Sequence, residues 1–182
     1  MTGNNAGATL WLTGLPGAGK STLAQALAGA LGEQGRRVQI LDGDDLRAGL
    51  SSDLGFSEQD RNTHVRRVGF VAQLLAAHGV IAIVPVIAPY ATARNGVRQQ
   101  HRDQGCRYFE VHVSTPAAEC MRRDPKGLYA RVAAGQLSGL TGFDAAYEAP
   151  TTPDLRLDTT DLTPEMAREA VLGLLDVSTH PV

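Results

Sequence analysis

A glycine-rich stretch near the N-terminus has the residue types and spacing of a phosphate-binding loop. Residues 14–21 fit the pattern of a glycine, four residues, a second glycine, a lysine and a serine or threonine. In such a loop, backbone N–H groups and a helix N-terminus bind phosphate oxygens, the lysine bridges the β- and γ-phosphates, and the hydroxyl ligates Mg²⁺. We therefore expect ATP and Mg²⁺ here, with Lys20 catalytic and Ser21 a metal ligand. The predicted nucleotide-binding residues are Gly14, Leu15, Pro16, Gly17, Ala18, Gly19, Lys20, Ser21 and Thr22.

Two aspartates, Asp42 and Asp44, follow an apolar run at residues 38–41. They lie two residues apart where a strand meets a loop, so one can face the metal while the other faces an acceptor hydroxyl. The alternative is a pair of turn and helix-cap aspartates before Leu46, because aspartate is common at such positions. The local sequence leaves both interpretations open.

A group of arginines lies close to Phe56 in the sequence. Arginine forks bind phosphate or sulfate in a bidentate manner, and an aromatic face stacks on a base. Helical spacing puts only some of these arginines on a common face, and the alternative is a solvated helix surface. The group comprises Arg47, Arg61, Arg66 and Arg67.

The elements that must position these residues alternate between apolar strands and helices. Strands are expected at residues 8–13, 38–41, 80–88, 108–113 and 155–157, the second of them buried. Helices are expected at residues 21–31, 57–79 and 92–103, near Pro116, and after Thr163 as N-cap with Pro164 at the first position. This alternation predicts an α/β fold with a mainly parallel sheet covered by helices on both faces.

The length of 182 residues predicts one domain over residues 1–182, with an irregular, glycine-rich segment at about 124–150 as a lid. A net charge of -2 argues against a nucleic-acid binder. The longest apolar stretch, residues 80–88, is too short to span a membrane, and residues 1–8 lack the positive charge of a signal peptide. The only cysteines, Cys106 and Cys120, are expected to be reduced and structural. We therefore expect a cytoplasmic protein.

A set of motifs in this order and spacing resembles the adenylylsulfate kinase family over about residues 8–158. The motifs are Gly14 to Thr22, Leu41-Asp42-Gly43-Asp44-Asp45-Leu46-Arg47, Asp53-Leu54-Gly55-Phe56-Ser57, Asp60-Arg61, Arg66-Arg67, Asp124-Pro125-Lys126-Gly127-Leu128-Tyr129, Thr141-Gly142-Phe143-Asp144 and Tyr147-Glu148-Ala149-Pro150. A generic phosphate-binding kinase would share only the first of them.

The resemblance implies a P-loop NTPase fold of the nucleotide-kinase type, a homodimer, and transfer of the γ-phosphate of MgATP to the 3′-hydroxyl of adenosine 5′-phosphosulfate in sulfate activation. By matching position, Asp44 receives or orients the acceptor proton and Asp42 supports the hydrated metal. Arg47 and Arg61 hold the anionic end of the substrate, Phe56 and Phe143 sandwich its adenine, and Lys126 belongs to the closing lid. The implied substrate-binding residues are Asp44, Arg47, Phe56, Arg61, His64, Ile87, Ala88, Lys126 and Phe143.

Three positions depart from the family pattern. Ala88 stands where many members have a serine before the Pro-Tyr pair, so phosphorylation of that side chain is chemically excluded. His64 replaces an expected asparagine. It is either a substrate contact that titrates between about pH 6 and 7, as an unperturbed histidine does, or a surface helix residue. Ala145-Ala146 replaces an Asp-Pro pair in the lid.

The sequence leaves two alternative functions open. One is a kinase of the same build that acts on another nucleoside or small-metabolite hydroxyl, which the altered acceptor residues allow. The other is a nucleotide-dependent regulatory switch. A guanine-specifying Asn-Lys-x-Asp is absent from the sequence, and the only Asp-x-x-Gly near a loop, at residues 124–127, comes too late in the chain for a switch.

Overall fold

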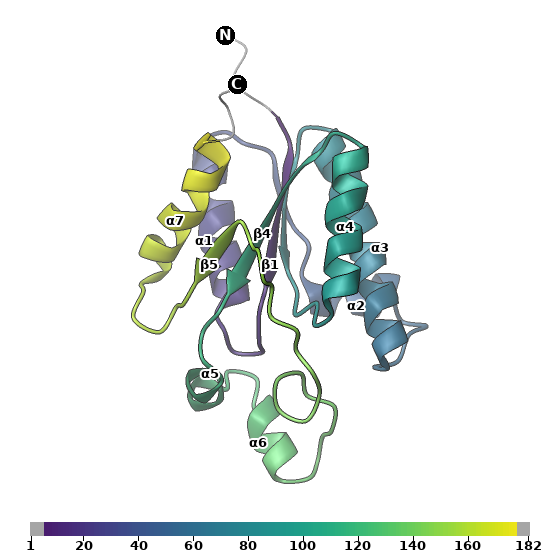
Figure 1. Ribbon diagram of the computed structural model, residues 1–182. Coiled ribbons are helices and arrows are strands. Elements are labelled where there is room, and N and C mark those ends of the chain that lie inside the picture. The colour runs from purple at the N-terminus through teal and green to yellow at the C-terminus, as the bar shows by residue number, and fades with distance from the viewer. Residues whose placement is uncertain (1–5, 178–182) are drawn as a thin grey trace.

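The computed structural model describes residues 6–177, which are built around a parallel β-sheet (Figure 1). The strands in this range, in the spatial order β2-β3-β1-β4-β5, are β1 (Ala8–Thr13), β2 (Val38–Ile40), β3 (Ile81–Pro85), β4 (Arg107–Val113) and β5 (Leu155–Leu157). All four pairings between them are parallel, so their carboxyl ends share one edge of the sheet. The predicted α/β fold with a parallel sheet is confirmed. The expectation that residues 1–8 form no signal peptide falls mostly on residues 1–5, which lie outside the described residues.

Helices cover both faces of the sheet (Figure 1). One face carries α1 (Lys20–Glu33) and α7 (Pro164–Val177), and the other carries α3 (Glu58–Ala77) and α4 (Ala91–Asp103). The shorter helices of the described residues are α2 (Gly43–Leu50), α5 (Ala117–Arg123) and α6 (Leu128–Ala133). None of the helices within residues 6–177 is long and apolar enough to cross a membrane.

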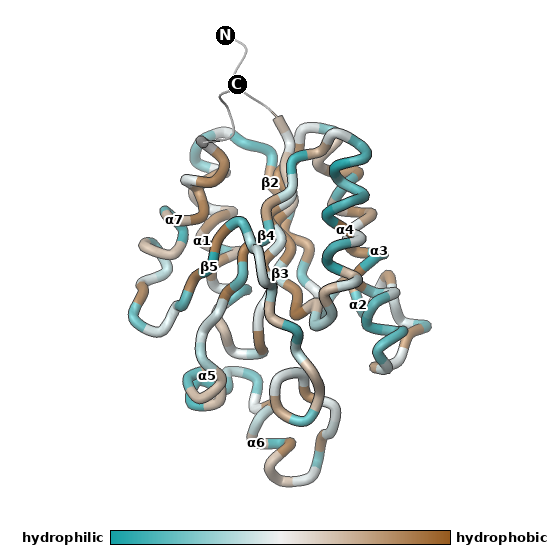
Figure 2. Tube along the Cα trace, viewed as in Figure 1, coloured by the Kyte–Doolittle hydropathy of each residue, from teal (hydrophilic) through white to brown (hydrophobic). Residues whose placement is uncertain are grey.

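The central strand β1 separates two hydrophobic cores. Successive side chains of a strand point to opposite faces, so Leu10 and Leu12 enter the core beneath α1 and α7, while Trp11 enters the core beneath α3 and α4. All three side chains are fully buried. The strand is therefore apolar without alternation, as expected for a parallel sheet with both faces covered, and Figure 2 shows hydrophobic residues gathered along the sheet.

Two predicted helix starts are confirmed by their caps. The Ser57 hydroxyl accepts a hydrogen bond from the backbone N–H of Asp60 at 3.2 Å. The Thr163 hydroxyl accepts one from the N–H of Met166 at 3.3 Å, with Pro164 as the first helical residue. Each bond satisfies an N–H group that a helix start leaves without an intrahelical partner.

The strand predicted at residues 38–41 is shorter and less buried than expected. β2 covers only Val38–Ile40 and lies at the edge of the sheet, where it pairs with β3 alone. Val38 and Ile40 are half-buried as a result. The apolar residues do form a strand. Because it has only one neighbouring strand, its side chains are less buried than those of the central strand β1.

The segment at residues 124–150 is less irregular than its composition indicated. It contains α6, and an isolated bridge between Thr141 and Ala145 closes the loop that follows. Figure 1 shows this segment beyond the carboxyl ends of the strands. The segment therefore lies at the edge of the sheet where the phosphate-binding loop begins.

Candidate active site

The glycine-rich loop joins β1 to α1, as its motif predicted. Gly17 and Gly19 have φ values of 79° and 97°, which disfavour any residue with a side chain. A Cβ on Gly17 would also lie 2.8 Å from the carbonyl oxygen of Cys120. No side chain caps the start of α1, so its first N–H groups have the arrangement that binds phosphate at helix N-termini.

Lys20 is held inside this loop. Its ammonium donates hydrogen bonds to the carbonyl oxygens of Gly14 at 2.9 Å and Leu15 at 2.7 Å. The side chain is buried, and burial lowers the pKa of Lys20 to about 8. Ser21 and Thr22 follow on the exposed first turn of α1. The loop thus combines a desolvated cation with two accessible hydroxyl residues.

The helix-cap interpretation of the aspartate pair is confirmed for Asp42. Asp42 is the N-cap of α2, where its Oδ1 accepts a hydrogen bond from the N–H of Asp44 at 2.9 Å. The Asp44 carboxylate is exposed and forms an ion pair with the ammonium of Lys126. The fold therefore brings the predicted proton acceptor together with the predicted lid lysine.

Two of the four arginines converge on Phe56. The guanidinium carbons of Arg47 and Arg61 lie 4.8 Å and 5.5 Å from the centre of its ring. Burial, and then the charge of Arg61, lower the pKa of Arg47 from its ordinary value. An anion beside these two cations would offset their repulsion.

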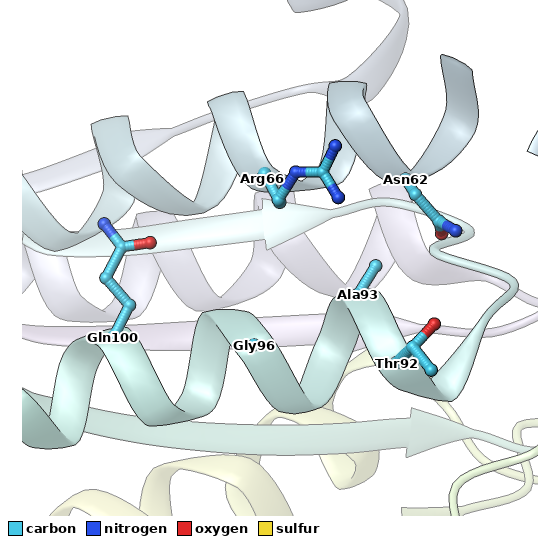
Figure 3. A pocket seen from close by; sticks show the side chains of 6 residues that line it. All are labelled: Asn62, Arg66, Thr92, Ala93, Gly96 and Gln100. Atoms are coloured by element: carbon cyan, nitrogen blue, oxygen red, sulfur yellow. The ribbon is translucent and has the colours of Figure 1, made fainter. Parts of the chain in front are cut away.

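The other two arginines, Arg66 and Arg67, have different partners. Arg67 forms a two-pronged ion pair with Asp53, with distances of 2.5 and 2.8 Å. Arg66 lines a cavity of about 190 Å³ between α3 and α4, to which α3 also contributes Asn62 and α4 contributes Thr92 (Figure 3). None of the residues that line this cavity belongs to the predicted site.

Arg61 connects helix α3 to the segment at residues 124–150. It donates hydrogen bonds to the carbonyl oxygen of Gly139 at 2.8 Å and to the hydroxyl of Thr141 at 3.2 Å. Phe143, two residues further on, is half exposed, and the centre of its ring lies 6.3 Å from that of Tyr129. Phe56 is exposed as well. Both predicted adenine-binding rings are thus accessible.

The surface interpretation of His64 is wrong, and so is its expected titration between pH 6 and 7. The side chain is 7% exposed, and its Nδ1 lies 3.0 Å from the hydroxyl of Ser51. Burial, together with the positive charges of Arg47 and Arg67, lowers the pKa of His64 to about 4. The ring is therefore neutral near pH 7 and is packed against Ser51, close to the charges of Arg47 and Arg67.

The loop after β3 carries Ile87 and Ala88, which the family resemblance placed at the substrate. The Thr13 hydroxyl donates a hydrogen bond to the carbonyl oxygen of Ile87 at 2.5 Å. Ala88 has a φ of 45°, an unusual value for a residue with a side chain. Thr13 immediately precedes the glycine-rich loop, so this hydrogen bond links the two loops.

Three polar side chains that contact or lie next to the phosphate-binding loop were not predicted from the sequence: Thr115, Arg123 and Thr159. The hydroxyls of Thr115 and Thr159 donate hydrogen bonds to the carbonyl oxygen of Ala18 at 3.1 Å and 2.9 Å. Arg123 donates to the Thr159 hydroxyl at 2.8 Å. Both threonines come just after a strand, so the signal that singled out Asp42 was available for them too.

Comparison with known proteins identifies the family. The family model described as adenylylsulphate kinase matches residues 6–158. The chain is 48% identical over 153 residues to a probable adenylyl-sulfate kinase of Synechocystis sp., covering 84% of each protein. It is also 47% identical over 172 residues to the bifunctional enzyme CysN/CysC of Mycobacterium tuberculosis, but it spans only 28% of that relative's length.

A solved structure agrees with these relatives. The APS kinase CysC of M. tuberculosis, in complex with AMPPNP and APS, superimposes with a TM-score of 0.91 and 46% identity. The match covers 94% of this chain and 98% of that one. Since the family model also spans the phosphate-binding loop, the arginine pair and Lys126, the chain belongs to the adenylylsulphate kinase family.

Proposed function

We propose that this protein is an adenylylsulfate kinase that transfers the γ-phosphate of ATP to the 3′-hydroxyl of adenosine 5′-phosphosulfate (APS), giving 3′-phosphoadenosine 5′-phosphosulfate for sulfate assimilation. The observation that carries the proposal is the pair Arg47 and Arg61 beside the exposed Phe56, in a chain with an intact phosphate-binding loop. A nucleotide with an adenine ring and a doubly anionic tail matches this combination of an aromatic face and two cations.

On the donor side, the glycine-rich loop binds the phosphates of ATP and Lys20 neutralises charge on the transferred group. The Ser21 hydroxyl and the Asp42 carboxylate would hold Mg²⁺, which would neutralise negative charge on the phosphates. Within residues 6–177, no group of three or more His, Cys, Asp or Glu residues could hold a metal by itself. This fits Mg²⁺, which is usually held by one or two protein oxygens together with substrate phosphates and water.

On the acceptor side, Asp44 receives or orients the proton of the 3′-hydroxyl. Its carboxylate is accessible, and Lys126 holds it by an ion pair. The same lysine carries a charge that can attract the phosphoryl group as it moves toward the hydroxyl. In this scheme, Lys126 acts when the segment at residues 124–150 closes as a lid over the bound nucleotides.

Ile87 and Ala88 line the acceptor pocket, while Phe56 and Phe143 enclose the adenine. His64 supports the pocket from below, since its buried ring bonds to Ser51 beneath Arg47. Transfer is direct and in line, because the methyl group of Ala88 cannot carry a phosphate.

We also infer that residues 1–182 act as one cytoplasmic domain that assembles as a homodimer. Analytical ultracentrifugation would test this assembly.

The decisive experiment compares APS with adenosine 5′-phosphate as acceptors at saturating MgATP. The second nucleotide keeps the ring and the 3′-hydroxyl but lacks the sulfate that Arg47 and Arg61 are proposed to bind. Lost charged hydrogen bonds commonly cost about 1.5 to 3 kcal/mol, so kcat/KM should favour APS by roughly one to two decades. The product is checked for phosphate on the 3′-oxygen. Equal kcat/KM values, or phosphate elsewhere, would favour a kinase with another acceptor.

A further inference from the structure

The backbone of the loop after β3 is held by three separate elements. The carbonyl oxygen of Ile87 accepts from Thr13 at the end of β1, and that of Ala88 accepts from the guanidinium of Arg94 at 2.6 Å. The carbonyl oxygen of Pro89 accepts from the N–H of Glu148 at 2.8 Å. Three consecutive carbonyl oxygens thus accept hydrogen bonds from three places: from β1, from α4 and from the end of the 124–150 segment.

From α4, Arg94 bonds both to the loop after β3 and to the end of the 124–150 segment. Its side chain is 2% exposed, and each of its nitrogens has its own acceptor. Nε bonds to the buried carboxylate of Glu110 at 3.0 Å, while the two terminal nitrogens bond to the carbonyl oxygens of Ala88 and Glu148, each at 2.6 Å. Only a planar fork with a fixed spread of donors can make these three bonds together.

The segment that Arg94 holds also lies directly on the acceptor loop. The Glu148 carboxylate accepts from the N–H of Ala91, the first residue of α4, at 2.7 Å. The hydroxyl of Tyr147 lies 3.1 Å from that of Thr13. The Tyr147–Glu148 pair therefore works as a strap that ties the end of the proposed lid to the acceptor loop.

The conformation that these contacts hold is one that the loop does not favour by itself. Ala88 has a φ of 45°, in the left-handed region that is unfavourable for residues with a Cβ. Such conformations persist when surrounding contacts over-determine them, and they cluster at functional sites. The Arg94 bond to the Ala88 carbonyl is one of those contacts.

We propose that Arg94 is a positioning residue for the acceptor. It fixes the Ile87–Ala88 backbone in its acceptor-binding form and couples that loop to the base of the lid, without touching the substrate. The proposal rests on the proposed function, because it assigns this loop to the acceptor rather than to ATP. Its Glu110 partner keeps the buried guanidinium charge compensated.

Arg94→Lys tests the proposal, with Arg98→Lys as the matched control. Lysine keeps a positive charge for Glu110 but cannot reproduce the three-way fork. Arg98 lies one turn further along α4 and shares the same carboxylate at 3.3 Å, together with Asp154 at 2.8 Å. Among the contacts of the described residues, Arg98 has no hydrogen bond to the loop at residues 87–91. Both variants therefore disturb the ion-pair network, but only one disturbs the loop.

The expected result is an APS KM raised about tenfold in Arg94→Lys, the usual scale for a lost charged hydrogen bond, with the ATP KM within twofold of wild type. Arg98→Lys should leave both KM values unchanged. An unchanged APS KM in Arg94→Lys, or an equal rise in both variants, would overturn the proposal. If Arg94→Lys does not fold, Glu148→Ala decides instead, because it removes the exposed bond to Ala91. An unchanged APS KM there would overturn the coupling between the loop and the base of the lid, because only the Glu148 side-chain contact is removed.

Amide hydrogen exchange separates this proposal from the proposed function. The N–H groups of Ala91 and Glu148 should exchange about tenfold faster in Arg94→Lys than in wild type, and at the wild-type rate in Arg98→Lys. Wild-type protein that fails to phosphorylate APS would refute the proposed function, while this exchange pattern still reports whether Arg94 holds the strap. Unchanged exchange in Arg94→Lys would refute the strap even in an active kinase.

Discussion

Lys126 forms an ion pair with Asp44, although the two residues lie 82 positions apart in the sequence. The pair joins the segment at residues 124–150 to the first turn of α2. Both side chains are largely exposed, at 59% for Lys126 and 75% for Asp44. Exposed pairs contribute only about 0 to 1 kcal/mol to stability, so the contact is better explained by a role in closing the site.

Lys126→Ala should therefore lower activity much more than stability. We expect kcat/KM for APS to fall about tenfold or more, because a positioned charge near the transferred group is lost. The melting temperature should stay within about 2 °C of wild type. The matched control is Arg131→Ala, which removes an exposed cation from α6 in the same segment. An equal loss of kcat/KM in both variants would argue against a specific role for Lys126.

Affinity for a non-hydrolysable ATP analogue should depend on pH through Lys20. In the free protein the pKa of Lys20 is about 8, and the charged form is the one that binds phosphate. The dissociation constant should stay level below pH 8 and then rise by up to about tenfold per pH unit. Lys20→Met should bind more weakly at every pH, with no such rise, and it should lose turnover while keeping its fold. Calorimetry measures both curves, and parallel curves would refute this role.

Arg47→Ala should reduce the preference for APS over adenosine 5′-phosphate. Removing one of the two cations beside Phe56 should cost about 1.5 to 3 kcal/mol for APS and much less for the acceptor without sulfate. The ratio of the two kcat/KM values should therefore fall by about one decade or more. Arg66→Ala is the control, because Arg66 faces the cavity between α3 and α4 instead. A ratio that falls equally in both variants would contradict the assigned tail contact.

Stability should fall as the pH drops from about 6.5 to 4, in part because of His64. The folded protein holds the pKa of His64 at about 4, against 6.5 for the ordinary side chain. In this window the unfolded chain binds the extra proton, so the free energy of unfolding decreases by up to about 1.4 kcal/mol per pH unit for this residue. Above pH 6.5 the contribution is fully present.

His64→Asn should make this pH dependence shallower in denaturant titrations. The APS KM should also show no titration of His64 between pH 6 and 7, because the ring is already neutral there. The imidazole NMR signal of His64 in the wild-type protein measures the pKa directly. A midpoint near 6.5 would contradict the burial argument.

The features that depend on neighbours in the chain could be predicted from the amino-acid sequence. The glycine-rich loop, the Ser57 and Thr163 caps and the strand at residues 155–157 each follow from a few adjacent residues, and each was predicted correctly. Glycine freedom, side-chain capping and apolar periodicity act within one or two turns. The order and spacing of the motifs also identified the family, because several local signals occur together over most of the chain.

Which of the predicted residues contact one another depends on the folding of distant segments, and it could not be predicted from the sequence. Arg61 faces Phe56 and the 139–141 loop whereas Arg67 turns to Asp53, and no rule of helical spacing selects between them. The low pKa of His64 depends on its burial, and on the nearby charges of Arg47 and Arg67, which the fold brings close to it. The left-handed backbone of Ala88 is held by Arg94 and by the strap at residues 147–148. Burial and strain depend on packing partners far away in the sequence, so local patterns carry no signal for them.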